Sequence, residues 1–263
     1  MTEVRLTHLK SDLVAGLKQG VLLAAAALVL ILPLPARTTL SAPVGSYGVA
    51  RSHPAQSHHD VFRGADFASH APSDDARFIA DWVADSANNR GLPFAILDKR
   101  DARLYVFAPG GRLIDASPVL LGAAPGDDSI AGIGSRPMAQ VRPEEKTTPA
   151  GRFVSEPGRN AGGEDVVWVD YGAAVSMHRV RLVDPKERRL ERLASPNPAD
   201  RRISYGCINV PVAFFEAVVW PTLGSRRAVV YVLPESRDVH AVFADAYAPD
   251  TKASRIGATL AHM

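Results

Sequence analysis

The sequence alternates short apolar runs with loops rich in Gly and Pro, and this pattern restricts the fold more than any other feature. The chain has 263 residues, of which 20 are Gly and 20 are Pro. Apolar runs this short, bounded by turn-forming residues, are typical of strands rather than of helices. We expect strands at 94–97, 104–107, 113–121, 166–169, 173–177 and 228–233, long loops at 122–151, 156–165 and 184–203, and one short helix at 212–220. The sequence therefore predicts one mainly β domain over residues 93–235.

A separate apolar segment lies near the start of the chain. Residues 21–32 form twelve uninterrupted apolar residues, VLLAAAALVLIL, preceded by basic residues and ended by Pro33. A membrane span needs about 20 apolar residues, and the core of an export signal needs about 7–15. The run therefore predicts a signal peptide at 1–36, with an uncleaved membrane anchor as the alternative. A buried helix of a soluble domain is a third interpretation.

Three further segments surround the predicted β domain. Residues 37–73 are rich in Ser, Ala, Pro, Gly and His, which predicts a partly disordered linker. Ser73 is a suitable N-cap for an amphipathic helix over 74–92, with Gly91 as its stop signal. We expect this helix to pack on the β domain. Residues 236–263 form a C-terminal tail of mixed composition.

Charge and cysteine content exclude several classes of protein. Lys and Arg total 30 against 28 Asp and Glu, a net charge of +2, which gives no basis for a nucleic-acid partner. A single cysteine excludes an intramolecular disulfide, a Cys-rich zinc site and a protein-bound iron–sulfur cluster. Four histidines lie within 37–73, where no helix or strand is expected to fix them, so we interpret them as part of the linker rather than as a metal site.

The single cysteine, Cys207, lies in a turn-like stretch, SYGCIN (204–209), shortly before the predicted helix. Backbone N–H groups near a helix start stabilise a thiolate, and Gly206 lets the backbone approach a substrate closely. His178 is the only one of eight histidines inside the predicted β domain. One thiol and one imidazole in the same domain favour Cys–His acyl transfer. The alternative is a buried structural cysteine with a hydrogen-bonded core histidine.

Two ordered motifs resemble those of the YkuD-type L,D-transpeptidases. Residues 204–209, with a histidine upstream, are similar to the family's Ser/Thr-His-Gly-Cys-hydrophobic-Asn or -Arg motif. TPAGRF at 148–153 is similar to the family's Thr-Pro-x-Gly-x-Phe segment, and the resemblance covers roughly residues 93–235. It implies a β-sandwich with short helices and long loops. It also implies a location in the periplasm or cell envelope, peptidoglycan stem peptides as partners, a role in cell-wall biogenesis and cell shape, and no cofactor or metal.

The resemblance further implies which residues perform the chemistry. Cys207 would be the nucleophile, and His178 would be the base that takes its proton. Arg179 would act only through its backbone carbonyl, which orients the base. An acyl group would be held as a thioester between two transfer steps, because a thiol is readily acylated.

The same resemblance assigns supporting roles around the cysteine. Backbone N–H groups around Tyr205, Gly206 and Cys207 would form an oxyanion hole. Ser204 and Asn209 would fix the turn by side-chain hydrogen bonds, although ordinary turn residues are an equal alternative. In the upstream motif, three residues are expected to shape the fold rather than touch substrate: Thr148, Pro149 and Gly151.

Two departures from the family pattern stand out. Tyr205 occupies the place of the family's second histidine, and a tyrosine with a pKa of about 10 is no base near neutral pH. The 28 residues between His178 and Cys207 exceed the usual family spacer. Within 179–206 eight Lys or Arg face four Asp or Glu, an excess of four positive charges. This loop would attract the carboxylates of a stem peptide or form a lid, or it is an ordinary solvated surface.

The sequence therefore predicts an exported cysteine acyltransferase that forms peptidoglycan cross-links through a Cys207 thioester. One alternative keeps the thiol but uses water as the acceptor, which makes the protein an L,D-carboxypeptidase-type hydrolase. A second alternative is a weakly active or non-catalytic cell-wall-binding homologue, which Tyr205 motivates.

Overall fold

The computed structural model describes residues 64–249. The predicted signal peptide or anchor at 1–36 and most of the predicted linker lie outside the described residues. Among the helices within 64–249, none is long and apolar enough to cross a membrane.

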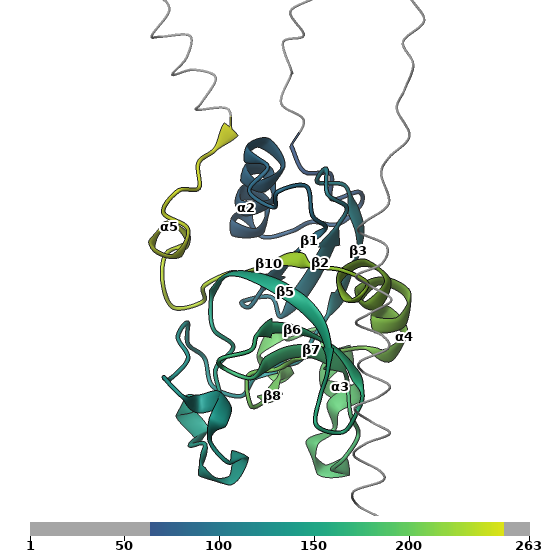
Figure 1. Ribbon diagram of the computed structural model, residues 1–263, viewed down its shortest axis with the longest axis vertical. Coiled ribbons are helices and arrows are strands. Elements are labelled where there is room, and N and C mark those ends of the chain that lie inside the picture. The colour runs from purple at the N-terminus through teal and green to yellow at the C-terminus, as the bar shows by residue number, and fades with distance from the viewer. Residues whose placement is uncertain (1–63, 250–263) are drawn as a thin grey trace, which may run out of the picture. The chain divides into compact units, whose positions relative to one another are not determined.

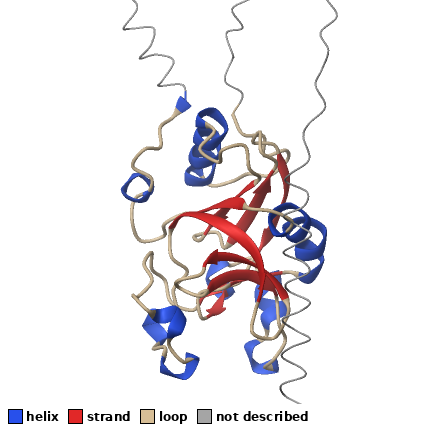
Figure 2. Cartoon of the chain, viewed as in Figure 1, coloured by secondary structure: helices blue, strands red, loops and turns tan. Residues whose placement is uncertain are grey.

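Strands form the centre of the described region, with helices around them (Figure 2). Eight strands make one sheet in the order β3-β2-β1-β10-β5-β6-β7-β9, and β4 and β8 form a separate parallel pair. The prediction of a mainly β domain is therefore confirmed. The strands are β1 (Phe94–Asp98), β2 (Arg103–Phe107), β3 (Leu113–Pro118), β4 (Leu121–Gly122), β5 (Gly151–Arg159), β6 (Asp165–Asp170), β7 (Val175–Arg179), β8 (Arg202–Ser204), β9 (Ile208–Val210) and β10 (Ala228–Val232).

Strand β5 joins the two halves of the large sheet and curves from one to the other (Figure 1). Its first part, 151–155, pairs with β10, whereas 156–159 pairs with β6. The prediction of a loop at 156–165 is therefore wrong for residues 156–159, which belong to β5. GRFVSEPGR lacks the apolar pattern of a strand, but backbone pairing on both sides requires no apolar side chain.

The main hydrophobic core lies between the two halves of the sheet. Side chains from β1, β2 and β10 meet side chains from β6, β7 and β9 there, including Leu97, Val106, Val167 and Met177. Two faces of strands with one shared core make the β-sandwich that the resemblance implies. The predicted helix at 212–220 covers part of this core. It begins as α4 (Val212–Phe214) and continues as η6 (Phe215–Gly224), a π-helical segment.

A second core covers the other face of β1, β2 and β10. Helix α2 (Asp74–Ser86) packs there through Ile79, Trp82 and Val83. Ser73 caps this helix as predicted, since its Oγ accepts the Ala76 N–H at 3.1 Å. The helix ends before the predicted residue 92 because Ala87 adopts a left-handed conformation, with φ of 53°.

The segments on either side of the predicted domain contribute to the same second core. Ala65 and Phe67 are buried in it, so residues 64–73 belong to the fold and are not a linker. In the predicted tail, α5 (Val239–Val242) and the buried Phe243 pack there too. Sparse apolar residues suffice in such segments because the outer face of β1, β2 and β10 supplies the rest of the apolar contact.

Two of the predicted loops contain short helices. The loop at 184–203 holds α3 (Arg189–Ala194) between the 3₁₀ turns η4 (Pro185–Glu187) and η5 (Pro198–Arg201). The loop at 122–151 holds three further 3₁₀ turns, η1 (Ile133–Ser135), η2 (Met138–Gln140) and η3 (Pro143–Glu145).

Candidate active site

Cys207 and His178 reach the same site because β7 and β9 are neighbouring parallel strands. His178 lies opposite Asn209 in this ladder, so Cys207, two residues earlier, is its diagonal neighbour. Both side chains line one pocket of about 320 Å³. Parallel strands need a crossover of a dozen or more residues, and the 28 residues between His178 and Cys207 are long enough to provide it.

The imidazole of His178 is oriented by the next residue in the chain. Its Nδ1 lies 2.8 Å from the carbonyl oxygen of Arg179. A carbonyl can only accept, so Nδ1 carries the proton and Nε2 is the unprotonated nitrogen of the neutral ring. This is the contact that the resemblance implies for the Arg179 carbonyl.

Burial and two nearby cations keep this imidazole neutral. Desolvation lowers the pKa of His178 below its usual value, and the hydrogen bond to the Arg179 carbonyl opposes this in part. The positive charges of Arg181 and Arg189 lower the pKa further. At neutral pH the ring is therefore available to accept a proton.

The thiol of Cys207 is half-buried and lines the pocket, so it is not closed off from solvent. Its Sγ lies 3.4 Å from the carbonyl oxygen of Ala174, to which it donates, and 3.8 Å from Ser176 Oγ. Within residues 64–249 the thiol makes no hydrogen bond to His178. In this rotamer the sulfur lies against the Ala174 carbonyl, and rotation about the Cα–Cβ bond moves it among staggered positions.

Glycine is required in the turn that presents the thiol. Gly206 has φ of 126°, and a Cβ there would lie 2.6 Å from the carbonyl oxygen of Thr147. Only glycine adopts this conformation without strain and fits against the neighbouring backbone.

Ser204 and Asn209 both hold the carbonyl of Cys207. Ser204 Oγ donates to it at 2.6 Å, and Asn209 Nδ2 donates at 3.2 Å. Ser204 Oγ also accepts the Gly206 N–H at 3.1 Å. The N–H of Gly206 is therefore engaged inside the turn, although the resemblance placed it among the oxyanion donors. Of the three N–H groups that the resemblance assigns to the oxyanion hole, those of Tyr205 and Cys207 remain.

Tyr205 lies at the rim of the pocket, with 42% of its surface exposed. Lys146 Nζ lies 4.0 Å from the centre of its ring, a distance at which a cation is attracted to the ring face. The residue in the place of the family's second histidine thus contributes an aromatic face beside a cation.

Arg189, which the sequence did not single out, lies on α3 and lines the pocket. Its side chain is only 15% exposed. Nη1 donates to Asn209 Oδ1 at 2.5 Å, and Nε donates to Glu187 Oε2 at 2.6 Å. Arg181 also lines this pocket. Among the described residues that line it, none is Asp or Glu. The only sequence signal for a pocket arginine was the excess of positive charge in 179–206. The position of α3 determines which of these arginines lines the pocket.

The described residues 64–249 contain no group of three or more His, Cys, Asp or Glu that could hold a metal ion.

No family model matches the sequence, and no curated protein matches it either. Similar solved structures include the helical cell shape determining protein Pgp2 from Campylobacter jejuni, at 16% identity and a TM-score of 0.36, covering 61% of this chain and 57% of that one. An L,D-transpeptidase from Mycobacterium smegmatis has 15% identity and a TM-score of 0.34, covering 53% and 58%. One from Xylanimonas cellulosilytica has 14% identity and a TM-score of 0.34, covering 54% and 60%.

The chain thus spans 57–60% of the length of these three structures. L,D-transpeptidases, the family that the two motifs resemble, are among the solved structures to which this chain is similar.

Proposed function

We propose that this chain is an exported cysteine acyltransferase that cross-links peptidoglycan stem peptides through a thioester on Cys207. One observation carries the proposal: Cys207 and His178 line the same pocket, and the Arg179 carbonyl holds the imidazole in the tautomer that can accept a proton. The two motifs that resemble those of L,D-transpeptidases support the choice of substrate.

In the first half-reaction the thiol rotates from the Ala174 carbonyl toward Nε2 of His178, which takes its proton. The thiolate attacks the carbonyl carbon of the L,D amide bond between meso-diaminopimelate and D-alanine in a donor peptide. A carbon–sulfur bond forms, and the carbon–nitrogen bond breaks as His178 returns the proton to the leaving amine. D-Alanine departs and leaves a thioester.

In the second half-reaction an amine of an acceptor peptide attacks the thioester. His178 takes a proton from this amine and gives it to the departing sulfur, which restores the thiol. One amide bond has been exchanged for another, so the reaction needs no external energy source. The two pocket arginines, Arg181 and Arg189, suit a substrate that carries carboxylates.

Both half-reactions pass through a tetrahedral oxyanion. Because the Gly206 N–H is bonded to Ser204, we assign the oxyanion hole to the N–H groups of Cys207 and Tyr205. Donors aimed at the developing charge are expected to contribute about 10²–10³ in rate.

Product analysis tests the choice of acceptor. Incubation of the protein with disaccharide tetrapeptides is expected to release D-alanine and give cross-linked dimers, measured by liquid chromatography and mass spectrometry. Trimmed tripeptides without dimers would show that water is the acceptor, as in an L,D-carboxypeptidase. Unchanged tetrapeptide would contradict both activities.

The pH dependence of acylation tests the role of His178. We expect the rate of adduct formation with the carbapenem imipenem to rise with pH, with a midpoint below the usual histidine value of about 6.5, because the lowered pKa leaves the ring neutral at lower pH. Arg189→Met removes a positive charge that lowers this pKa, so its midpoint should move upward.

Stopped-flow or mass-spectrometric rates from pH 4.5 to 8 measure both midpoints. The exposed Arg226 offers a matched control, since Arg226→Met should leave the midpoint in place. A wild-type midpoint above the usual histidine value, or an unshifted Arg189→Met profile, would argue against His178 as the base.

A further inference from the structure

We propose that Thr148 is a positioning residue that orients the peptide bond between Gly206 and Cys207, so that the Cys207 N–H faces the pocket as an oxyanion donor. The inference rests on the proposed acyl transfer and extends it to a buried residue that touches no substrate.

The hydroxyl of Thr148 is fully buried between two backbone groups. Its Oγ1 accepts the Gly122 N–H at 3.0 Å and lies 2.9 Å from the carbonyl oxygen of Gly206. A hydroxyl has one proton, and an acceptor carbonyl must receive it. The hydrogen bond from Thr148 to Gly206 therefore has only one direction.

This bond determines the direction of the next N–H group. A trans peptide unit is planar, and its C=O and N–H point to opposite sides. Because the Gly206 carbonyl points toward the buried Thr148, the Cys207 N–H points away from it. Among the hydrogen bonds of residues 64–249 none uses the Cys207 N–H as donor, so it is free to bind a ligand atom.

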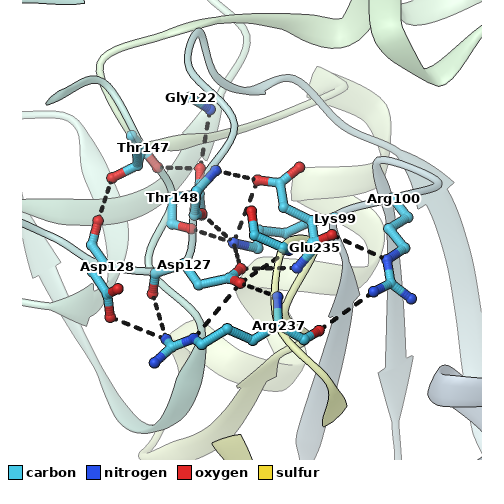
Figure 3. A network of polar contacts seen from close by, with 12 residues as sticks. Lys99, Arg100, Gly122, Asp127, Asp128, Thr147, Thr148, Glu235 and Arg237 are labelled. Atoms are coloured by element: carbon cyan, nitrogen blue, oxygen red, sulfur yellow. Dashed lines mark hydrogen bonds and ion pairs between the residues drawn. The ribbon is translucent and has the colours of Figure 1, made fainter. Parts of the chain in front are cut away.

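Thr148 is itself held by a buried ionic network at the end of β1 (Figure 3). Lys99 Nζ donates to the Thr148 carbonyl at 2.9 Å, to the Gly126 carbonyl at 2.6 Å and to Asp127 Oδ1 at 2.8 Å. The side chain of Lys99 is 0% exposed, and Glu235 lies 3.5 Å from its Nζ.

Asp127 extends this network to the chain that follows β10. Its carboxylate accepts three consecutive backbone N–H groups, from residues 235, 236 and 237, at 2.8, 3.0 and 2.8 Å. Thr148 is therefore fixed to the half of the sheet that contains β1 and β10. Through Gly206 it fixes the turn that precedes β9, in the other half.

A purely structural role for Thr148 predicts a different result from a positioning role. An oxyanion donor accelerates attack on a carbonyl carbon, but alkylation of the same thiol by iodoacetamide forms no oxyanion. Loss of the Thr148 hydroxyl should therefore slow acylation while sparing alkylation. General disruption of the turn should slow both reactions alike.

The experiment compares wild type with Thr148→Val, which keeps the shape without the hydroxyl, and Thr148→Ser, which keeps the hydroxyl. We expect Thr148→Val to lower the rate of imipenem acylation about 10-fold or more and to change iodoacetamide alkylation by less than about 3-fold. Thr148→Ser should restore acylation. Equal losses in both reactions, or unchanged acylation in Thr148→Val, would overturn the inference.

A second readout separates this inference from the proposed function. The chain has one cysteine, so labelling with ¹⁵N-cysteine gives a single amide signal in an NMR spectrum. That signal should move in Thr148→Val and stay in place in Thr148→Ser. If wild type formed no imipenem adduct, the proposed function would fail, and the NMR comparison would still test the orientation of the peptide bond. An unmoved signal in a folded Thr148→Val protein would overturn it.

Discussion

Replacement of the single thiol, Cys207→Ser, should abolish both imipenem adduct formation and cross-linking of stem peptides. Wild type is expected to gain one intact imipenem molecule, because the thiolate attacks the β-lactam carbonyl, the ring carbon–nitrogen bond opens and nothing leaves. Intact-protein mass spectrometry measures this directly. No other thiol in the chain can substitute, since Cys207 is the only cysteine.

The same experiment separates His178 from a histidine outside the site. His178→Ala should slow adduct formation about 10²–10⁴-fold, the usual contribution of a general base. His240 is exposed and does not line the pocket, so His240→Ala should leave the rate unchanged. A persistent adduct in Cys207→Ser, or equal losses in the two histidine variants, would contradict the Cys–His assignment.

Lys99→Met should lower the free energy of unfolding by about 3–5 kcal/mol, because it removes one partner of a fully buried ion pair. Asp127 and Glu235 lose their shared cation, and the carbonyls of Gly126 and Thr148 lose their donor. Urea unfolding at pH 7, followed by circular dichroism, measures the loss. Lys186 is exposed, and Lys186→Met should change stability by no more than about 0.5 kcal/mol.

The effect of Lys99→Met should also diminish in acid. Burial by itself raises the pKa of Asp127, but hydrogen bonds from Lys99 and from the backbone of residues 235 and 237 outweigh it and lower the pKa to about 2. An unfolded Asp has a pKa of about 3.9, so the wild type has this stabilisation above about pH 4 and loses it as pH falls toward 2. A difference between the two proteins below about 1 kcal/mol at pH 7 would contradict a structural role for the ion pair.

The strands with apolar runs could be predicted from the sequence, and β5 could not. Strands β1, β2, β6, β7 and β10 lie at predicted positions because their side chains enter a core on at least one face. The second half of β5 is defined by backbone pairing with β6, and its GRFVSEPGR sequence contains no corresponding signal. The sequence therefore did not predict β5, the strand that connects the two halves of the sandwich.

The sequence pointed to the thiol and the imidazole that line one pocket, but not to the contacts within that pocket. Cys207 and His178 stood out because the predicted domain has one thiol and one imidazole. The sequence did not show that the Gly206 N–H is bonded to Ser204 inside the turn. It also did not show that the thiol contacts the Ala174 carbonyl or that α3 brings Arg189 to Asn209, because these contacts join segments remote in sequence.

The amino-acid sequence by itself indicated the fold class and the candidate thiol and imidazole, because apolar periodicity and residue type are local properties of a chain. Only the tertiary structure decided the neighbour relation of β7 and β9, the orientation of the turn at Gly206 and the network that holds Thr148. These features follow from strand order and from hydrogen bonds across 49 or more positions, between Lys99 and Thr148 and between Thr148 and Gly206. No local pattern specifies such pairings, since the energy that selects them exists only once the two halves of the sheet enclose a common core.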